Sequence, residues 1–211
     1  MENYVVTVAR GFGSGGKEVA SKLAKALAIR CYENRILTLA SQLTGLDESA
    51  YVNADERLEG NYLVNSLRTL PRAMHFIPVD RDFTSNHSLF EHQARIIREL
   101  VKDESCVIVG KCADFVLQDH PRKISVYIEA SRPSCVARTM EKMGVSERDA
   151  NYIISRTDKY RAEYYKFYTR GGDWTSPLNY DLILNSDKAG IQGCVDVILH
   201  YIRMKLPDAL V

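Results

Sequence analysis

Residues 5–27 read VVTVARGFGSGGKEVASKLAKAL, an apolar run, then a glycine-rich turn, then an amphipathic segment. The apolar residues at 4–9 predict a short buried strand, and the helical spacing of the apolar residues that follow predicts a helix over 16–28. Between the two stand glycines 11, 13, 15 and 16, followed by Lys17. Glycine allows a backbone path on which consecutive N–H groups face inward, and such a turn suits an anion.

The turn also fits the pattern of a phosphate loop. The stretch from Gly11 to Lys17 matches G-x-x-x-x-G-K and lies between a predicted strand and a predicted helix, as this motif requires. The helix start adds partial positive charge, and Lys17 can reach terminal phosphate oxygens. An ordinary glycine-rich turn is the alternative, but motif, context and lysine together favour phosphate binding. The predicted phosphate-binding residues are Gly11, Phe12, Gly13, Ser14, Gly15, Gly16 and Lys17.

The composition limits the class of protein. A chain of 211 residues is expected to form one domain, 1–211, with or without insertions. It carries 28 basic and 27 acidic side chains, so nothing suggests nucleic acid as a main partner. The acidic residue at position 2 argues against a signal peptide, and no apolar run is long enough for a membrane helix. We therefore expect a cytoplasmic protein. The five cysteines lack CxxC spacing and indicate buried, reduced thiols, and the histidines form no zinc motif.

Apolar strands alternate with helices along the rest of the chain. After the first strand, strands are predicted at 106–110, 123–130 and 180–186, and helices at 34–44, about 89–101, 131–144, 147–168 and 190–205. Strands that are apolar throughout are typical of a parallel sheet covered on both faces. We therefore predict a three-layer α/β P-loop fold. Residues 34–104 are expected to form a helical insertion, with a loop around 77–87.

The stretch 147–173 forms a helical lid in this interpretation, because it is too polar to be core. It contains RTDKYRAEYY at 156–165, whose arginines could close over a phosphoryl group in transfer and compensate its charge. The alternative is a solvated helix face with pairs such as Lys159–Glu163. The aromatic residues of this stretch are expected to pack on the protein rather than to stack on a base. The sequence has no NKxD and no convincing DxxG, so a GTPase is not indicated.

Four motifs together resemble the cytidylate kinase-like family, P-loop relatives of cytidylate kinase among the nucleoside monophosphate kinases. They are GFGSGGKEVA at the start, IVGKCADFVL at 108–117, RTDKYRAEYYKFYT at 156–169 and NYDLILNS at 179–186. The likeness covers nearly the whole chain. The motifs are fairly specific for the family and much less specific for a substrate.

The resemblance implies that the insertion at 34–104 binds the acceptor, and it implies a role for particular residues. The glycine turn would hold the donor phosphates, with Arg138 near the donor side. Glu33 matches a carboxylate near the acceptor nucleotide, and Lys111 stands where cytidylate kinase keeps an arginine for the acceptor phosphate. Arg156, Asp158 and Arg161 match an R-x-D-x-x-R lid pattern, in which the arginines meet phosphates and the aspartate meets the acceptor's sugar. Lys17, Arg156 and Arg161 would be catalytic, and we expect the two arginines to act in catalysis rather than in folding.

Two departures from the family pattern concern magnesium and substrate. Glu18 replaces the Ser or Thr that ligates Mg²⁺ after the lysine; it could bind the ion directly or through water, or only favour the helix start. Val109 stands where cytidylate kinase has an aspartate, and its cytosine-reading segment has no convincing match in 45–95. The resemblance implies ATP as phosphate donor, Mg²⁺ as cofactor and a nucleoside monophosphate, CMP first, as acceptor. A small-metabolite kinase and a non-catalytic nucleotide sensor are the alternatives.

Overall fold

The structure is a computed structural model that describes residues 2–33 and 87–209. The helix predicted at 34–44, the helical pieces predicted over 45–86 and nearly all of the loop predicted around 77–87 lie outside the described residues. The remaining predicted elements can be compared with the structure directly.

Five parallel strands form the sheet, and four of them lie where the apolar runs predict strands. They are β1 (Val5–Arg10), β2 (Arg30–Tyr32), β3 (Cys106–Val109), β4 (Lys123–Glu129) and β5 (Leu182–Asn185), in the order β2-β3-β1-β4-β5. Strand β1 is central, and its Val5 lies opposite Cys106 on one side and Lys123 on the other. All six of its residues are buried, including Arg10, which the sequence places in the turn.

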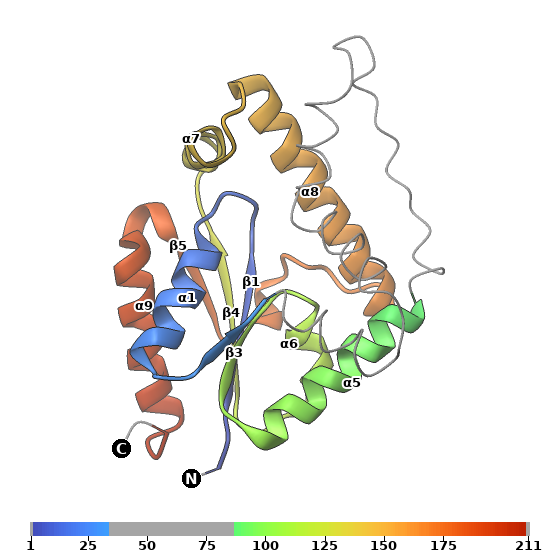
Figure 1. Cartoon of the computed structure of the whole chain (residues 1–211), viewed down its shortest axis with the longest axis vertical. Coiled ribbons are helices and arrows are strands. Elements are labelled where there is room, and N and C mark those ends of the chain that lie inside the picture. Colours follow the sequence, from blue (N-terminus) through green and yellow to red (C-terminus); the bar gives the residue numbers. More distant parts are fainter. Residues whose placement is uncertain (1, 34–86, 210–211) are drawn as a thin grey trace.

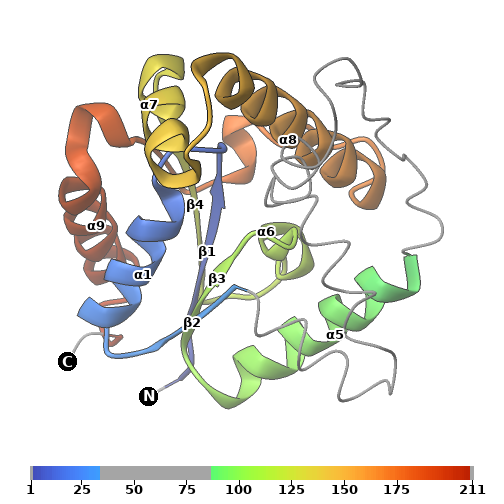
Figure 2. The ribbon, with the colours of Figure 1, turned by 45° about the horizontal axis from the view of Figure 1, so that its top comes forward.

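Helices cover both faces of the sheet and produce the predicted three layers (Figure 1). Helices α1 (Gly16–Ala26) and α9 (Ser186–Lys205) lie on one face, where apolar residues of both helices pack on β1, β3 and β4. Helices α5 (His87–Asp103), α6 (Ala113–Val116) and α8 (Glu147–Tyr168) lie on the other. Helix α7 (Arg132–Met143) and the start of α8 lie beyond the carboxyl ends of the strands (Figure 2), and a short 3₁₀ helix, Pro177–Asn179, precedes β5.

Helix α8 contributes to the core, so the prediction that it is too polar for the core is wrong. Its buried residues include Ile153, Ile154 and four tyrosines. The ring of Tyr168 stacks on Phe90 of α5, with 3.9 Å between the centroids. The tyrosines at 160, 164 and 168 recur every four residues and form an apolar stripe within a sequence that reads as polar. The aromatic residues therefore pack on the protein, as expected. The predicted helix start is confirmed, since Ser146 accepts a hydrogen bond from the Asp149 N–H.

Two other predictions concern the chain as a whole. Four of the five cysteines are buried, as expected, but Cys31 is exposed. Among residues 2–33 and 87–209, no helix combines the length and apolar character needed to cross a membrane.

Candidate functional site

The glycine turn lies at the carboxyl end of the central strand and leads directly into α1. Gly13 and Gly15 have φ of +77° and +80°, a left-handed conformation that favours glycine. A Cβ on Gly13 would lie 2.6 Å from the Cys135 carbonyl oxygen of α7, so the loop and α7 approach too closely for a side chain there. The loop conformation therefore depends on glycine at these positions.

The N–H groups of the loop divide into two sets. The Gly11 N–H donates to the Ile128 carbonyl at 3.1 Å, and the Ser14 N–H donates to the Gly11 carbonyl at 3.3 Å, so both fix the loop itself. In the part of the chain that the structure describes, the N–H groups of Gly13 and Gly15 donate no hydrogen bond. These donors, at the start of α1, are suited to bind an anion.

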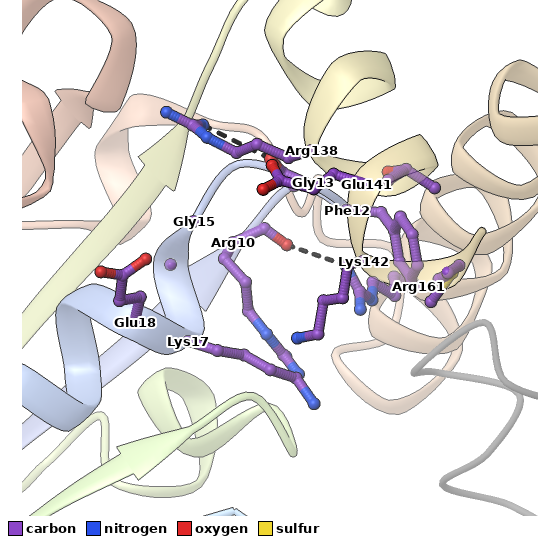
Figure 3. A pocket seen from close by; sticks show the side chains of 14 residues that line it. Arg10, Phe12, Gly13, Gly15, Lys17, Glu18, Arg138, Glu141, Lys142 and Arg161 are labelled. Atoms are coloured by element: carbon purple, nitrogen blue, oxygen red, sulfur yellow. Dashed lines mark hydrogen bonds between the residues drawn. The ribbon is translucent and has the colours of Figure 1, made fainter. Parts of the chain in front are cut away.

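A cavity of about 470 Å³ opens beside this loop (Figure 3). Every predicted phosphate-binding residue lines it except Ser14, which is fully buried and accepts a hydrogen bond from the Gly16 N–H at 3.4 Å. The remaining lining comes from the end of β1, from α1, α7 and α8: Arg10, Glu18, Arg138, Thr139, Glu141, Lys142, Met143 and Arg161.

Arg138 contacts the loop, in agreement with its predicted place on the donor side. Its guanidinium donates to the Gly13 carbonyl at 3.4 Å and to the Ser186 hydroxyl at 3.1 Å. Ser186 in turn donates to the Ser14 carbonyl at 2.6 Å. Through these bonds α7 and the start of α9 hold the backbone of the loop from two sides.

A second cavity, of about 40 Å³, lies beyond the end of β3. Arg10 and Arg161 line both cavities, so the two adjoin. The second cavity is otherwise lined by Ala9, Val109, Gly110, Lys111, Cys112, Asp114, Tyr164 and Trp174. Lys111, which the resemblance assigns to the acceptor phosphate, lines this second cavity and not the one beside the glycine loop.

Positive charge is concentrated at this boundary. Burial, and next the neighbouring Arg10 charge, lowers the pKa of Lys111 well below its usual value, while Glu33 acts in the opposite direction. The Nζ of Lys17 lies 2.6 Å from Oε1 of Glu33, and Nη2 of Arg10 lies 3.8 Å from the same oxygen. Glu33 thus lies against cations that line the two cavities, and its place near the acceptor stays a prediction.

The backbone that carries Lys111 is itself unusual. Gly110, Lys111 and Cys112 have φ of +71°, +61° and +51° in succession. Left-handed residues that are not glycine cost energy and persist where the surrounding structure imposes them, often at functional sites. Here the turn directs a buried lysine into the second cavity.

The residues predicted on α8 have different environments. Arg161 is buried, and its Nη1 donates to the Arg10 carbonyl at 3.1 Å and to Asp158 at 3.3 Å. Asp158 accepts the Phe12 N–H at 2.9 Å, so it holds the glycine loop, whereas the resemblance assigns it to the acceptor's sugar. Arg156 is partly exposed and lines neither cavity.

Glu18, the predicted magnesium ligand, lies at the rim of the larger cavity. Its side chain is 58% exposed and pairs with Lys22 at 3.0 Å. Figure 3 shows it pointing away from the Lys17 side chain. Within the described ranges, no three His, Cys, Asp or Glu side chains are grouped as a metal site. The metal prediction for Glu18 stays a prediction.

Sequence reasoning missed Arg10 and Asp114. Arg10 was detectable as a charged residue at the carboxyl end of an apolar strand, immediately before the glycine turn. Asp114 lies in the second cavity, where burial raises its pKa and the Tyr165 hydroxyl donates to Oδ2 at 2.8 Å. No local pattern marks Asp114, because its role depends on a partner 51 residues away.

Comparison with solved structures supports the same fold. An uncharacterized protein from Eubacterium ventriosum is 26% identical, with a TM-score of 0.69, and the match covers 95% of this chain and 98% of that one. Shikimate kinase from Bacteroides thetaiotaomicron is 13% identical, with a TM-score of 0.51 and coverage of 95% and 98%. A Thermus thermophilus protein is 14% identical, with a TM-score of 0.55 and coverage of 98% and 99%. The last two share the fold at low identity.

No curated protein matches the sequence. The sequence model of the cytidylate kinase-like family, however, matches residues 5–188 and so includes the glycine loop, Lys111, Arg138 and the polar helix. Together with the P-loop kinase fold and the two adjoining cavities, this match assigns the chain: it belongs to the cytidylate kinase-like family.

Proposed function

We propose that the protein is a kinase that transfers the γ-phosphoryl group of ATP to a nucleoside monophosphate, with CMP as the first candidate. The observation that carries the proposal is the pair of adjoining cavities that share Arg10 and Arg161. A donor on the glycine loop and an acceptor near Lys111 would meet at these two arginines. In-line transfer requires such an arrangement, in which catalysis consists of positioning and charge neutralisation.

The charge around the boundary favours an anionic acceptor. Lys111 is buried next to Arg10, Lys17 and Arg161, all of which lower its pKa, and Glu33 is the acidic group that raises it. An acceptor phosphate would add negative charge where these cations gather. A neutral acceptor would leave the local repulsion in place, which is why a monophosphate is preferred over an uncharged metabolite.

Magnesium is expected to accompany ATP, and the residues at the cavity fit it. Glu18 lines the larger cavity and offers carboxylate oxygens, the donors that magnesium prefers. In kinases the ion is held by one or two carboxylates together with phosphate oxygens and water. Magnesium neutralises charge on the β- and γ-phosphate oxygens. The chain itself provides the loop N–H groups, Lys17 and the arginines that position the phosphates.

The proposal is tested by measuring ADP release with ATP, magnesium and a panel of acceptors. The panel contains CMP, UMP, AMP, GMP and small phosphorylated and hydroxylated metabolites. We expect turnover with a monophosphate, and loss of at least ~10² in kcat for Lys17→Ala, because the lysine stabilises charge in the transfer. Lys25→Ala, an exposed lysine in the last turn of the same helix, is the matched control and should retain activity.

The outcome separates the alternatives. If the protein prefers a metabolite over every monophosphate, it is still a kinase, but its acceptor belongs to a different class of compound. Tight ATP binding without turnover on any acceptor would support a nucleotide sensor, for which the valine at 109 and the glutamate at 18 are the relevant departures from the family. Equal activity of Lys17→Ala and wild type would exclude the glycine loop as the donor site.

A further inference from the structure

We infer that Arg10 is a catalytic residue that contacts the phosphoryl group during transfer. This inference rests on the proposed function, because it names the side chain that would meet the group passing between the two cavities. Arg10 lies outside the glycine-loop pattern, and none of the motifs that suggest a kinase includes it in a role.

The position of Arg10 is the first argument. It is the last residue of the central strand, and its backbone is held on one side by pairing with Ile128 of β4. Its carbonyl accepts the hydrogen bond from Arg161, and its side chain is 11% exposed. Figure 3 shows the side chain extending past Lys17 into the space beside the loop. A guanidinium on such a rigid support can be held accurately against a reacting group.

Two glycines shape the slot in which the side chain lies. A Cβ on Gly16 would lie 2.5 Å from the Arg10 Cβ, and a Cβ on Gly110 would overlap the Arg10 guanidinium. Gly110 also has φ of +71°. The first glycine begins α1 and the second directly follows β3, so both neighbouring segments leave room for this arginine. The slot directs its guanidinium along the boundary between the cavities.

The charges near Arg10 indicate what it would bind. Glu33 lies 3.8 Å from Arg10 and 2.6 Å from Lys17, so one carboxylate lies against two cations that face the site. A phosphoryl group in transfer is also an oxyanion and could contact the same two cations. Arginine suits this role because its planar fork bonds two oxygens at once and keeps its charge.

The step itself needs no further reactant. An acceptor oxygen forms a bond to the γ-phosphorus, the bond from that phosphorus to the β,γ-bridging oxygen breaks, and the electron pair leaves with ADP. An acceptor phosphate that is already ionised has no proton to lose. Arg10 stays protonated throughout and compensates the charge on the transferred oxygens.

The test compares Arg10→Met and Arg10→Lys with Arg122→Met. Arg122 is a matched control, since its side chain is 15% exposed and pairs with Asp208 at 2.8 Å, remote from both cavities. Three quantities are measured: kcat, the dissociation constants of ATP and ADP separately, and the melting temperature. Arg10→Met should lower kcat by about 10³-fold, a typical effect of a charge-compensating arginine. It should weaken ATP binding and leave ADP binding within about twofold.

Arg10→Lys keeps a cation next to Glu33, so it can still be measured if the methionine variant does not fold. It should fold, bind ADP as wild type does and still lose at least ~10-fold in kcat, because an ammonium cannot bond two oxygens in a fork. Arg122→Met should keep wild-type kcat. Loss of ATP and ADP binding together, or wild-type kcat in Arg10→Lys, would overturn the inference and leave Arg10 a structural residue.

The two proposals can fail separately. If wild type transfers phosphate to no acceptor in the panel, the proposed function fails. The ratio of ATP to ADP affinity in Arg10→Met still reports contact with the terminal phosphate in that case. An unchanged ratio then rejects the role of Arg10 independently of turnover.

Discussion

Lys111 is a case in which stability and the proposed function oppose each other. Burial, followed by the charge of Arg10, lowers its pKa well below 10.5. At pH values between the lowered pKa and 10.5, the unfolded chain binds more protons than the folded chain, so the free energy of unfolding rises with pH there. Below that interval the folded protein bears the full penalty of a buried, repelled cation. The site therefore holds this lysine at a cost.

Replacing Lys111 by methionine should expose this cost. Lys111→Met should melt above wild type at pH 7, by about 2–4 °C for each ~1 kcal/mol of penalty removed. The advantage should shrink as the pH approaches 10.5, because the unfolded wild-type chain also loses the lysine charge there. Calorimetry at pH 7 and pH 9.5 measures both values. Lys102→Met, at a side chain that is 65% exposed, is the control and should change little at either pH. A methionine variant that melts below wild type at both values would contradict the argument.

Glu18 and Glu141 provide a second comparison at the residue scale. Both carboxylates line the larger cavity, but only Glu18 follows the lysine of the loop directly. If Glu18 takes part in holding magnesium, Glu18→Gln should raise the magnesium concentration required for half-maximal activity, by about 10-fold or less because phosphates and water supply most ligands. Glu141→Gln should leave the magnesium titration unchanged. Identical magnesium titrations for wild type and Glu18→Gln would show that Glu18 does not hold magnesium and only places a charge at the helix start.

At the scale of elements, helix α8 shows that the burial of a helix cannot be predicted from its residue types alone. Its bounds were predictable from the Ser146 cap and the following helical stretch, yet its environment was not. Tyr, Arg and Asp count as polar, but a tyrosine ring buries much apolar area and an arginine can be buried when its donors are satisfied. Arg161 meets that condition through the carbonyl of Arg10 and the carboxylate of Asp158. The helix therefore serves the core and the site together.

A structural role for Arg161 follows and corrects the expectation that it acts in catalysis alone. Arg161→Ala removes two hydrogen bonds of a buried charged group, so it should destabilise the protein by about 2 kcal/mol as well as impair transfer. Arg148→Ala, at an exposed position of the same helix, should change stability by no more than about 0.5 kcal/mol. Urea unfolding of both variants measures the difference.

Asp158 extends this test. Its carboxylate binds both Arg161 and the Phe12 N–H, so Asp158→Ala and Arg161→Ala share one network. Their effects in the double variant should be smaller than the sum of the single effects. Strict additivity, or an Arg161→Ala variant as stable as wild type, would show that the network does not hold α8 to the loop.

For the whole molecule, the sequence was most informative where function and local structure coincide. The glycine loop, the strand before it and the helix after it were predictable because each has a local signal, and so was the parallel sheet. The junction between the cavities was not, since it assembles Arg10 from β1, Lys111 from the turn after β3 and Arg161 from α8. Such a site exists only once the sheet places these elements side by side.

The position of β1 in the middle of the sheet has a consequence for biosynthesis. This strand is synthesised before its two neighbours, which begin about one hundred residues later, at Cys106 and Lys123. Pairing over such separations raises contact order and slows folding. During translation the apolar stretch VVTVAR has no strand on either side, and exposed stretches of this kind favour aggregation. Binding of a chaperone to this stretch of the nascent chain would therefore matter most before residue 129 has been synthesised.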